Sequence, residues 1–130
     1  MGMKLLLDTH TLIWWAASSE KFPLKVLSLL DDRQNDLLLS VASIWEMQIK
    51  CQDGKLELGK PLSQLVSNQI ANNGLRILPI EALRIYALQN LPLVHRDPFD
   101  RVMIAQAIVE NLLFVSKDLV LGEYPVQQVC

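Results

Sequence analysis

Short apolar runs alternate with longer amphipathic segments along most of the chain. Runs without polar alternation are typical of strands buried on both faces, whereas apolar positions three and four apart indicate helices. The pattern predicts strands at residues 5–7, 37–39, 75–80, 112–115 and 126–129. It predicts helices at residues 10–17, 23–33, 43–51, 61–72, 81–89 and 98–111. This alternation indicates a parallel sheet with helices on both faces.

Turn and boundary residues support this division. Pro23 and Pro98 suit the first turn of a helix, because proline lacks the N–H that a helix start leaves unpaired. Asp53-Gly54 and Asn73-Gly74 are typical helix ends. Asn35-Asp36 is predicted to be a turn before the second strand.

Composition places the chain among folded proteins. It has 130 residues, of which 51% are hydrophobic and 20% charged, so we expect one globular domain over residues 1–130. No apolar stretch approaches the roughly 18 residues of a membrane span, and Asp8 interrupts the N-terminal run. Cys51 and Cys130 form no motif. We expect a reduced, cytoplasmic protein that does not contact a membrane.

Charge narrows the possible ligands. Twelve Lys and Arg against fourteen Asp and Glu give a net charge of −2. This balance argues against a broad basic surface for nucleic acid, but leaves a local basic patch or a metal-mediated phosphate contact open. Neither a Gly-rich phosphate loop nor a G-x-S-x-G nucleophile motif is present.

Acidic residues recur where predicted strands end and helices begin. In a parallel sheet these positions share one edge, where ligands bind near the reversal of strand order. The acids at such positions are Asp8, Glu46, Glu81, Asp97, Asp100 and Asp118. Clustered carboxylates repel one another unless a cation neutralises them. Carboxylates without a His or Cys ligand set suit Mg²⁺ or Mn²⁺, the ions of phosphate chemistry.

Each acid also has a purely structural interpretation. Asp8 suits the N-cap of the helix after it. Ser43-x-x-Glu46 matches a capping box, and Glu46 with Lys50 forms a favourable i,i+4 pair. Asp97 before Pro98 suits an N-cap, which places Asp100 at N3. The joint pattern, rather than any single acid, favours a functional site.

Aromatic and histidine residues leave alternatives open. Trp14, Trp15 and Trp45 could stack on bases, although their helical spacing favours the core or a subunit interface. His10 and His95 lack metal-ligand spacing.

Four segments together resemble a known family. Residues 5–15 (LLLDTHTLIWW), 43–50 (SIWEMQIK), 95–107 (HRDPFDRVMIAQA) and 116–118 (SKD) look like the PIN domain, and more closely like the VapC-type toxins of bacterial toxin–antitoxin pairs. The likeness covers nearly the whole chain, and the segment 95–107 is its most specific part. It implies a three-layer α/β/α sandwich around a central parallel sheet.

The resemblance also implies an activity and a site. It implies an endoribonuclease that hydrolyses RNA phosphodiester bonds with Mg²⁺ or Mn²⁺, with Asp8, Glu46, Asp100 and Asp118 as the catalytic, metal-binding acids. Thr9 and Ser116 match hydroxyl residues beside the acids, although many relatives have Thr where this chain has Ser116. Asp97 matches a residue common in the subgroup but outside the four acids.

Partners follow from the same likeness. Such proteins are commonly homodimers that a small antitoxin neutralises. Four cations near the acids could position RNA phosphates or could equally pair with the acids: Lys50, Arg96, Arg101 and Lys117.

Three rival functions are weighed against this one. A haloacid-dehalogenase-type phosphatase needs a second Asp two residues after the first, where this chain has His10. A receiver domain needs an acidic pair near its first strand and an Asp after its third, but the third predicted strand ends at Ile80-Glu81. A PIN-like module that binds RNA or protein without catalysis would not need all four acids.

Overall fold

The computed structural model describes residues 2–17, 24–91, 97–116 and 128–129. Its sheet consists of β1 (Lys4–Leu7), β2 (Asp36–Ser40), β3 (Arg76–Leu78), β4 (Leu113–Val115) and β5 (Gln128–Val129). All pairings are parallel, in the order β3-β2-β1-β4-β5. The predicted parallel sheet is therefore confirmed.

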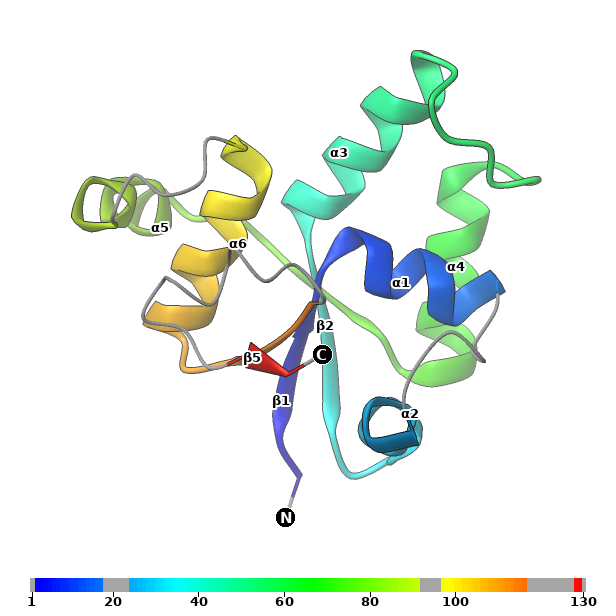
Figure 1. Ribbon diagram of the computed structural model, residues 1–130, viewed down its shortest axis with the longest axis horizontal. Coiled ribbons are helices and arrows are strands. Elements are labelled where there is room, and N and C mark those ends of the chain that lie inside the picture. Colours follow the sequence, from blue (N-terminus) through cyan, green and yellow to red (C-terminus); the bar gives the residue numbers. More distant parts are fainter. Residues whose placement is uncertain (1, 18–23, 92–96, 117–127, 130) are drawn as a thin grey trace.

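The helices are α1 (Thr9–Ala17), α2 (Leu24–Asp31), α3 (Val41–Gln52), α4 (Leu62–Asn73), α5 (Ala82–Tyr86) and α6 (Pro98–Val109). A 3₁₀ turn, η2 (Ala87–Asn90), follows α5. Helices lie on both sides of the sheet, with α1, α2 and α4 on one side and α6 on the other (Figure 1). The molecule is thus a three-layer α/β/α sandwich, as expected.

Strand alternation divides the apolar residues between two cores. Leu5, Leu7, Leu37 and Leu39 face a cluster with residues of α1, α2, α3 and α4. The residues between them, including Leu6, face a second cluster built largely from α6. Because β1 is central and its three leucines are fully buried, the unbroken leucine run is explained by two apolar faces.

Strand order also determines where a site can form. The chain passes from β1 outward through β2 to β3, and then returns to the other side of β1 with β4. The reversal lies between β1 and β4, whose carboxyl ends carry Asp8 and Ser116. This is the position at which parallel α/β sheets bind ligands.

Several predicted boundaries are wrong, each for a local reason. Asp36, predicted in a turn, begins β2 and donates its N–H to the Met3 carbonyl at 2.8 Å. β3 ends at Leu78, earlier than predicted, and Pro79, with no N–H for the ladder, follows it. The single helix predicted over 81–89 is α5 followed by η2.

The start of α3 corrects a second prediction. The helix begins at Val41, and its N-cap is Ser40, whose Oγ accepts the Ala42 N–H at 3.0 Å. Ser43 is therefore inside the first turn, so the proposed Ser43–Glu46 capping box does not form. The described part of the chain contains no helix long and apolar enough to cross a membrane.

Candidate functional site

Asp8 lies directly after β1 at the sheet reversal and is 8% exposed. Its Oδ1 accepts the Thr11 N–H at 2.8 Å, as an N-cap of α1 does. Its Oδ2 accepts the Ser116 Oγ–H at 2.6 Å, which joins the ends of β1 and β4. Asp8 therefore both caps α1 and presents a held carboxylate at the expected edge.

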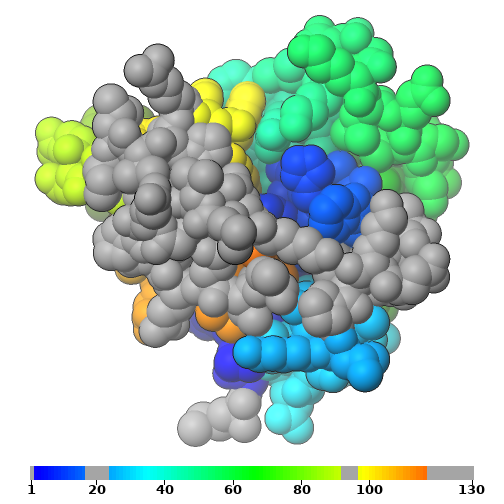
Figure 2. Space-filling view, viewed as in Figure 1, coloured from blue at the N-terminus to red at the C-terminus, as the bar shows by residue number. Residues whose placement is uncertain are grey.

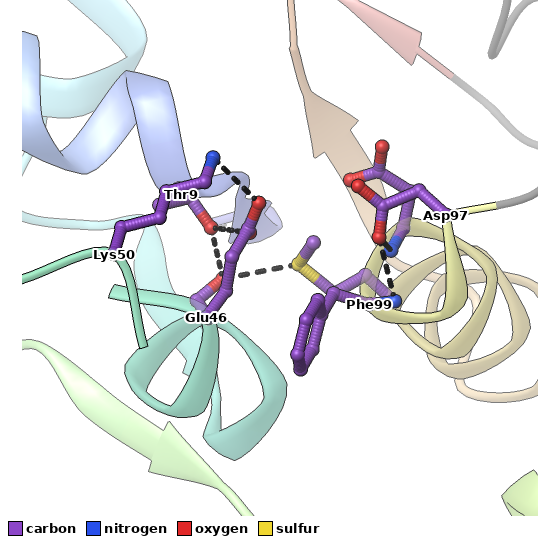
Figure 3. Close-up of polar contacts among 8 residues, drawn as sticks. Thr9, Glu46, Lys50, Asp97 and Phe99 are labelled. Carbon is purple, nitrogen blue, oxygen red and sulfur yellow. Dashed lines mark hydrogen bonds and ion pairs between the residues drawn. The ribbon is translucent and has the colours of Figure 1, made fainter. Parts of the chain in front are cut away.

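Glu46 is the second buried acid, 6% exposed on α3. Thr9 Oγ1 donates to its Oε1 at 2.7 Å, and Lys50 Nζ pairs with its Oε2 at 3.0 Å (Figure 3). Thr9 follows Asp8 in the sequence. The residue that donates a hydrogen bond to Glu46 is therefore the direct neighbour of the first acid. The structure thus connects Glu46 to the end of β1 through Thr9, the hydroxyl residue that the sequence places beside Asp8.

Lys50 was predicted either to position an RNA phosphate or to pair with an acid, and the structure shows the pairing with an acid. Its ammonium pairs with Glu46, as the i,i+4 spacing predicted, while about a third of its side chain is exposed. Arg101, another cation considered for RNA phosphates, donates from Nη2 to the Leu88 carbonyl at 3.2 Å. Both cations are therefore anchored to the protein.

Asp97 and Asp100 begin α6. Asp97 is the N-cap: its Oδ1 accepts the Phe99 N–H at 2.9 Å and the Asp100 N–H at 3.4 Å, and Pro98 is at N1. Asp100 is therefore at N3, which confirms the helix register predicted from Pro98. The Asp97 side chain and Glu46 flank the space between α6 and α3 in Figure 3.

An open cleft of about 410 Å³ separates the two helices. The described residues that line it are Glu46, Ile49, Lys50, Asp97, Pro98 and Phe99. The surfaces of α3 and α6 adjoin at one end of the molecule in the space-filling view (Figure 2). A buried carboxylate, a lysine and a helix start therefore face one opening to solvent.

Sequence reasoning gave Ser43 a capping role and missed its contacts in this region. Ser43 is fully buried, with its Oγ 3.1 Å from Thr9 Oγ1 and 3.0 Å from Met103 Sδ. These contacts connect α3 to α1 and α6. The sequence shows a hydroxyl residue, Ser43, one turn before Glu46. Whether Ser43 caps the helix or packs inside it depended on where α3 begins.

Three predicted residues, Asp118, Lys117 and Arg96, lie outside the described part of the chain. Within the described ranges, no three His, Cys, Asp or Glu side chains are grouped so as to hold a metal ion. The donor chemistry of Asp8 and Glu46 nevertheless suits a divalent cation. Each carboxylate oxygen accepts one contact above and has a second lone-pair position.

Comparison with known proteins agrees with this architecture. The PIN domain family model matches residues 5–126, and the chain therefore belongs to the PIN domain family. No curated protein matches the sequence.

Solved structures share the fold at low sequence identity. VapBC2 from Rickettsia felis, bound to a promoter DNA fragment, aligns with a TM-score of 0.75 at 16% identity, over 98% of each chain. VapBC-1 from nontypeable Haemophilus influenzae aligns with a TM-score of 0.63 at 16% identity, over 98% of this chain and 97% of that one. FitAcB from Neisseria gonorrhoeae aligns with a TM-score of 0.60 at 19% identity, over 97% of this chain and 96% of that one.

Proposed function

We propose that this chain is a Mg²⁺- or Mn²⁺-dependent endoribonuclease of the VapC type, the toxin of a toxin–antitoxin pair. The observation that carries the proposal is the pair of buried carboxylates, Asp8 and Glu46, coupled through Thr9 at the reversal of strand order. Membership of the PIN domain family supports nuclease chemistry.

Asp8, Glu46, Asp100 and Asp118 would hold the cation. When bound, the cation lowers the pKa of a water and neutralises charge that develops on the phosphate. The chain orients its own acids: Ser116 holds Asp8 and Thr9 holds Glu46. Lys50 balances the charge of Glu46, which limits repulsion between the buried acids. No covalent nucleophile is needed in this scheme.

The test is cleavage of a mixed RNA pool by the purified chain with Mg²⁺, with Mn²⁺ and with a chelator. We expect cleavage only with the divalent ions, and none by Asp8→Asn or Glu46→Gln. Asp8→Asn should keep the fold, because Asn also caps helices well. Glu57→Gln, which changes an exposed acid outside the site, is the matched control and should cleave normally.

Other outcomes identify the rival functions. RNA binding without cleavage under any metal condition would indicate a catalytically silent module. Hydrolysis of a small chromogenic phosphate ester without RNA cleavage would indicate a phosphatase. Unchanged cleavage by Asp8→Asn, with wild-type metal dependence, would contradict the assignment of the site.

A cognate antitoxin is the second part of the proposal. The VapBC and FitAB structures with this fold, some bound to DNA, support a small partner protein. Expression of the chain alone should arrest bacterial growth. Co-expression of a small neighbouring reading frame, with a DNA-binding head and a disordered tail, should restore it. Absence of such a frame and of any growth effect would contradict this part.

A further inference from the structure

An aromatic pair lies at the rim of the cleft between α3 and α6. The rings of Trp45 and Phe99 have centroids 5.1 Å apart and an interplanar angle of 88°, an edge-to-face contact. Phe99 lines the cleft, while Trp45 is the residue before Glu46 on α3. The pair therefore connects the cleft to the outer surface.

The exposure of Trp45 is unusual for its residue type. Its side chain is 60% exposed, whereas Trp14 and Trp15 pack partly buried against the core of the other sheet face. Trp14 and Trp15 thus occupy one of the two locations that their spacing favoured, the core rather than a subunit interface. The Phe99 contact restrains the indole of Trp45 and leaves most of it open to solvent.

The charges at the cleft indicate which part of an RNA substrate an exposed aromatic ring would bind. The chain has a net charge of −2, and Lys50 is the one cation among the described residues lining the cleft. Lys50 is already paired with Glu46, so phosphate contacts offer little affinity there. Base stacking on an aromatic ring needs no positive charge and tolerates any base.

We propose that Trp45, supported by Phe99, is a stacking platform for an unpaired base of the RNA substrate beside the scissile phosphate. The inference deepens the proposed function, on which it rests, because it names the residue that binds the RNA strand beside the cleft. The cleft beside Phe99 is open to solvent, and its volume of about 410 Å³ is in the range of sites for small ligands. In a duplex the base faces are already stacked and unavailable.

The test compares Trp45→Ala, Trp45→Phe and Leu24→Ala. Leu24 is 81% exposed on α2, remote from the cleft, and controls for the loss of an exposed apolar side chain. Binding of a labelled single-stranded oligoribonucleotide is measured in an Asp8→Asn background, and KM and kcat are measured without that change. Light scattering records the mass of each variant.

We expect Trp45→Ala to weaken binding and raise KM about 5- to 100-fold, with kcat nearly unchanged. Trp45→Phe should retain most of the affinity, and Leu24→Ala all of it. The loss should be the same factor at 50 and 200 mM salt, because stacking releases no counterions.

Two results would overturn the inference while leaving the nuclease function intact. One is wild-type cleavage, binding and KM in Trp45→Ala. The other is a change of oligomeric mass in Trp45→Ala with RNA binding unaltered, which would place Trp45 in a protein interface. If the wild-type chain neither binds nor cleaves RNA, the proposed function itself fails, and this inference fails with it.

Discussion

At the scale of single residues, the structural and functional interpretations of an acid are compatible. Asp8 accepts the Thr11 N–H as a helix cap, yet a carboxylate has about four acceptor positions. Capping therefore leaves capacity for a cation. The same holds for Glu46, which forms the predicted pair with Lys50 and also accepts from Thr9.

Thr9 offers a sharp test at this scale. Thr9→Val removes the hydroxyl that holds Glu46 Oε1 but keeps the side-chain shape. We expect a loss of about 1.5–3 kcal/mol in the free energy of unfolding, because the lost hydrogen bond is to a charged group. RNA cleavage should also fall, and more metal should be needed. Chemical denaturation and metal titrations of the cleavage rate measure the two effects.

Thr11→Val is the matched control for that variant. Thr11 is equally buried, but its Oγ1 donates to the Val115 carbonyl rather than to an acid. It should lose about 0.5–1.5 kcal/mol for the lost hydrogen bond, because the Val115 carbonyl still accepts the Asp8 N–H at 3.2 Å, and it should keep its activity per folded molecule. Full activity and unchanged metal dependence in Thr9→Val would show that Thr9 does not orient Glu46 for catalysis.

At the scale of elements, the start of α6 separates two neighbouring acids. Asp97 caps the helix, and Asp100 occupies N3. We expect Asp97→Ala to lose about 0.5–2 kcal/mol of stability, and Asp97→Asn to lose little, since Asn caps equally well. Asp100→Ala should instead weaken metal binding and activity. Melting curves and metal titrations of each variant measure these effects.

The opposite pattern would invert the two roles. In that case Asp97→Ala would melt like the wild type yet need far more metal, while Asp100→Ala would melt early and cleave normally. A loss of activity in Asp97→Asn, with its stability retained, would likewise place Asp97 among the groups that serve the cation.

At the scale of the whole molecule, exposed apolar side chains suggest self-association. In the leucine-rich helix α2, Val26 and Leu30 are buried in the core, and Leu24 is the one large apolar residue that is strongly exposed. Leu83 and Tyr86 on α5 are instead 66% and 64% exposed. With Ile85, α5 exposes three large apolar residues where α2 exposes one, so α5 is the better candidate for a contact surface.

We predict a homodimer that uses α5. Light scattering at micromolar concentration should give about twice the chain mass of 14.7 kDa. Leu83→Glu should shift the protein toward the monomer, because it places a charge in an apolar contact, whereas Leu24→Glu on α2 should not. A wild-type mass near 14.7 kDa would contradict the dimer, and a dimeric Leu83→Glu would contradict the surface.

Much of the fold follows from the sequence alone, because its signals are local. The leucine run of β1 has no polar alternation, which requires two covered faces and hence helices on both sides of the sheet. Pro98 determined the register of α6, and the i,i+4 spacing determined the Lys50–Glu46 pair. The position of Asp8 at the carboxyl end of β1 followed from the apolar run that it ends.

Tertiary structure decided the contacts that cross between elements. Ser40 rather than Ser43 caps α3, because β2 runs directly into the helix and its last residue becomes the cap. Thr9 meets Glu46 across 37 positions only because β1 and β2 are neighbours in the sheet. Trp45 is 60% exposed and contacts the Phe99 ring of α6 edge-to-face, a contact between two helices that are distant in the sequence. Such contacts depend on the strand order and on the placement of helices against the sheet, which periodicity along the chain does not specify.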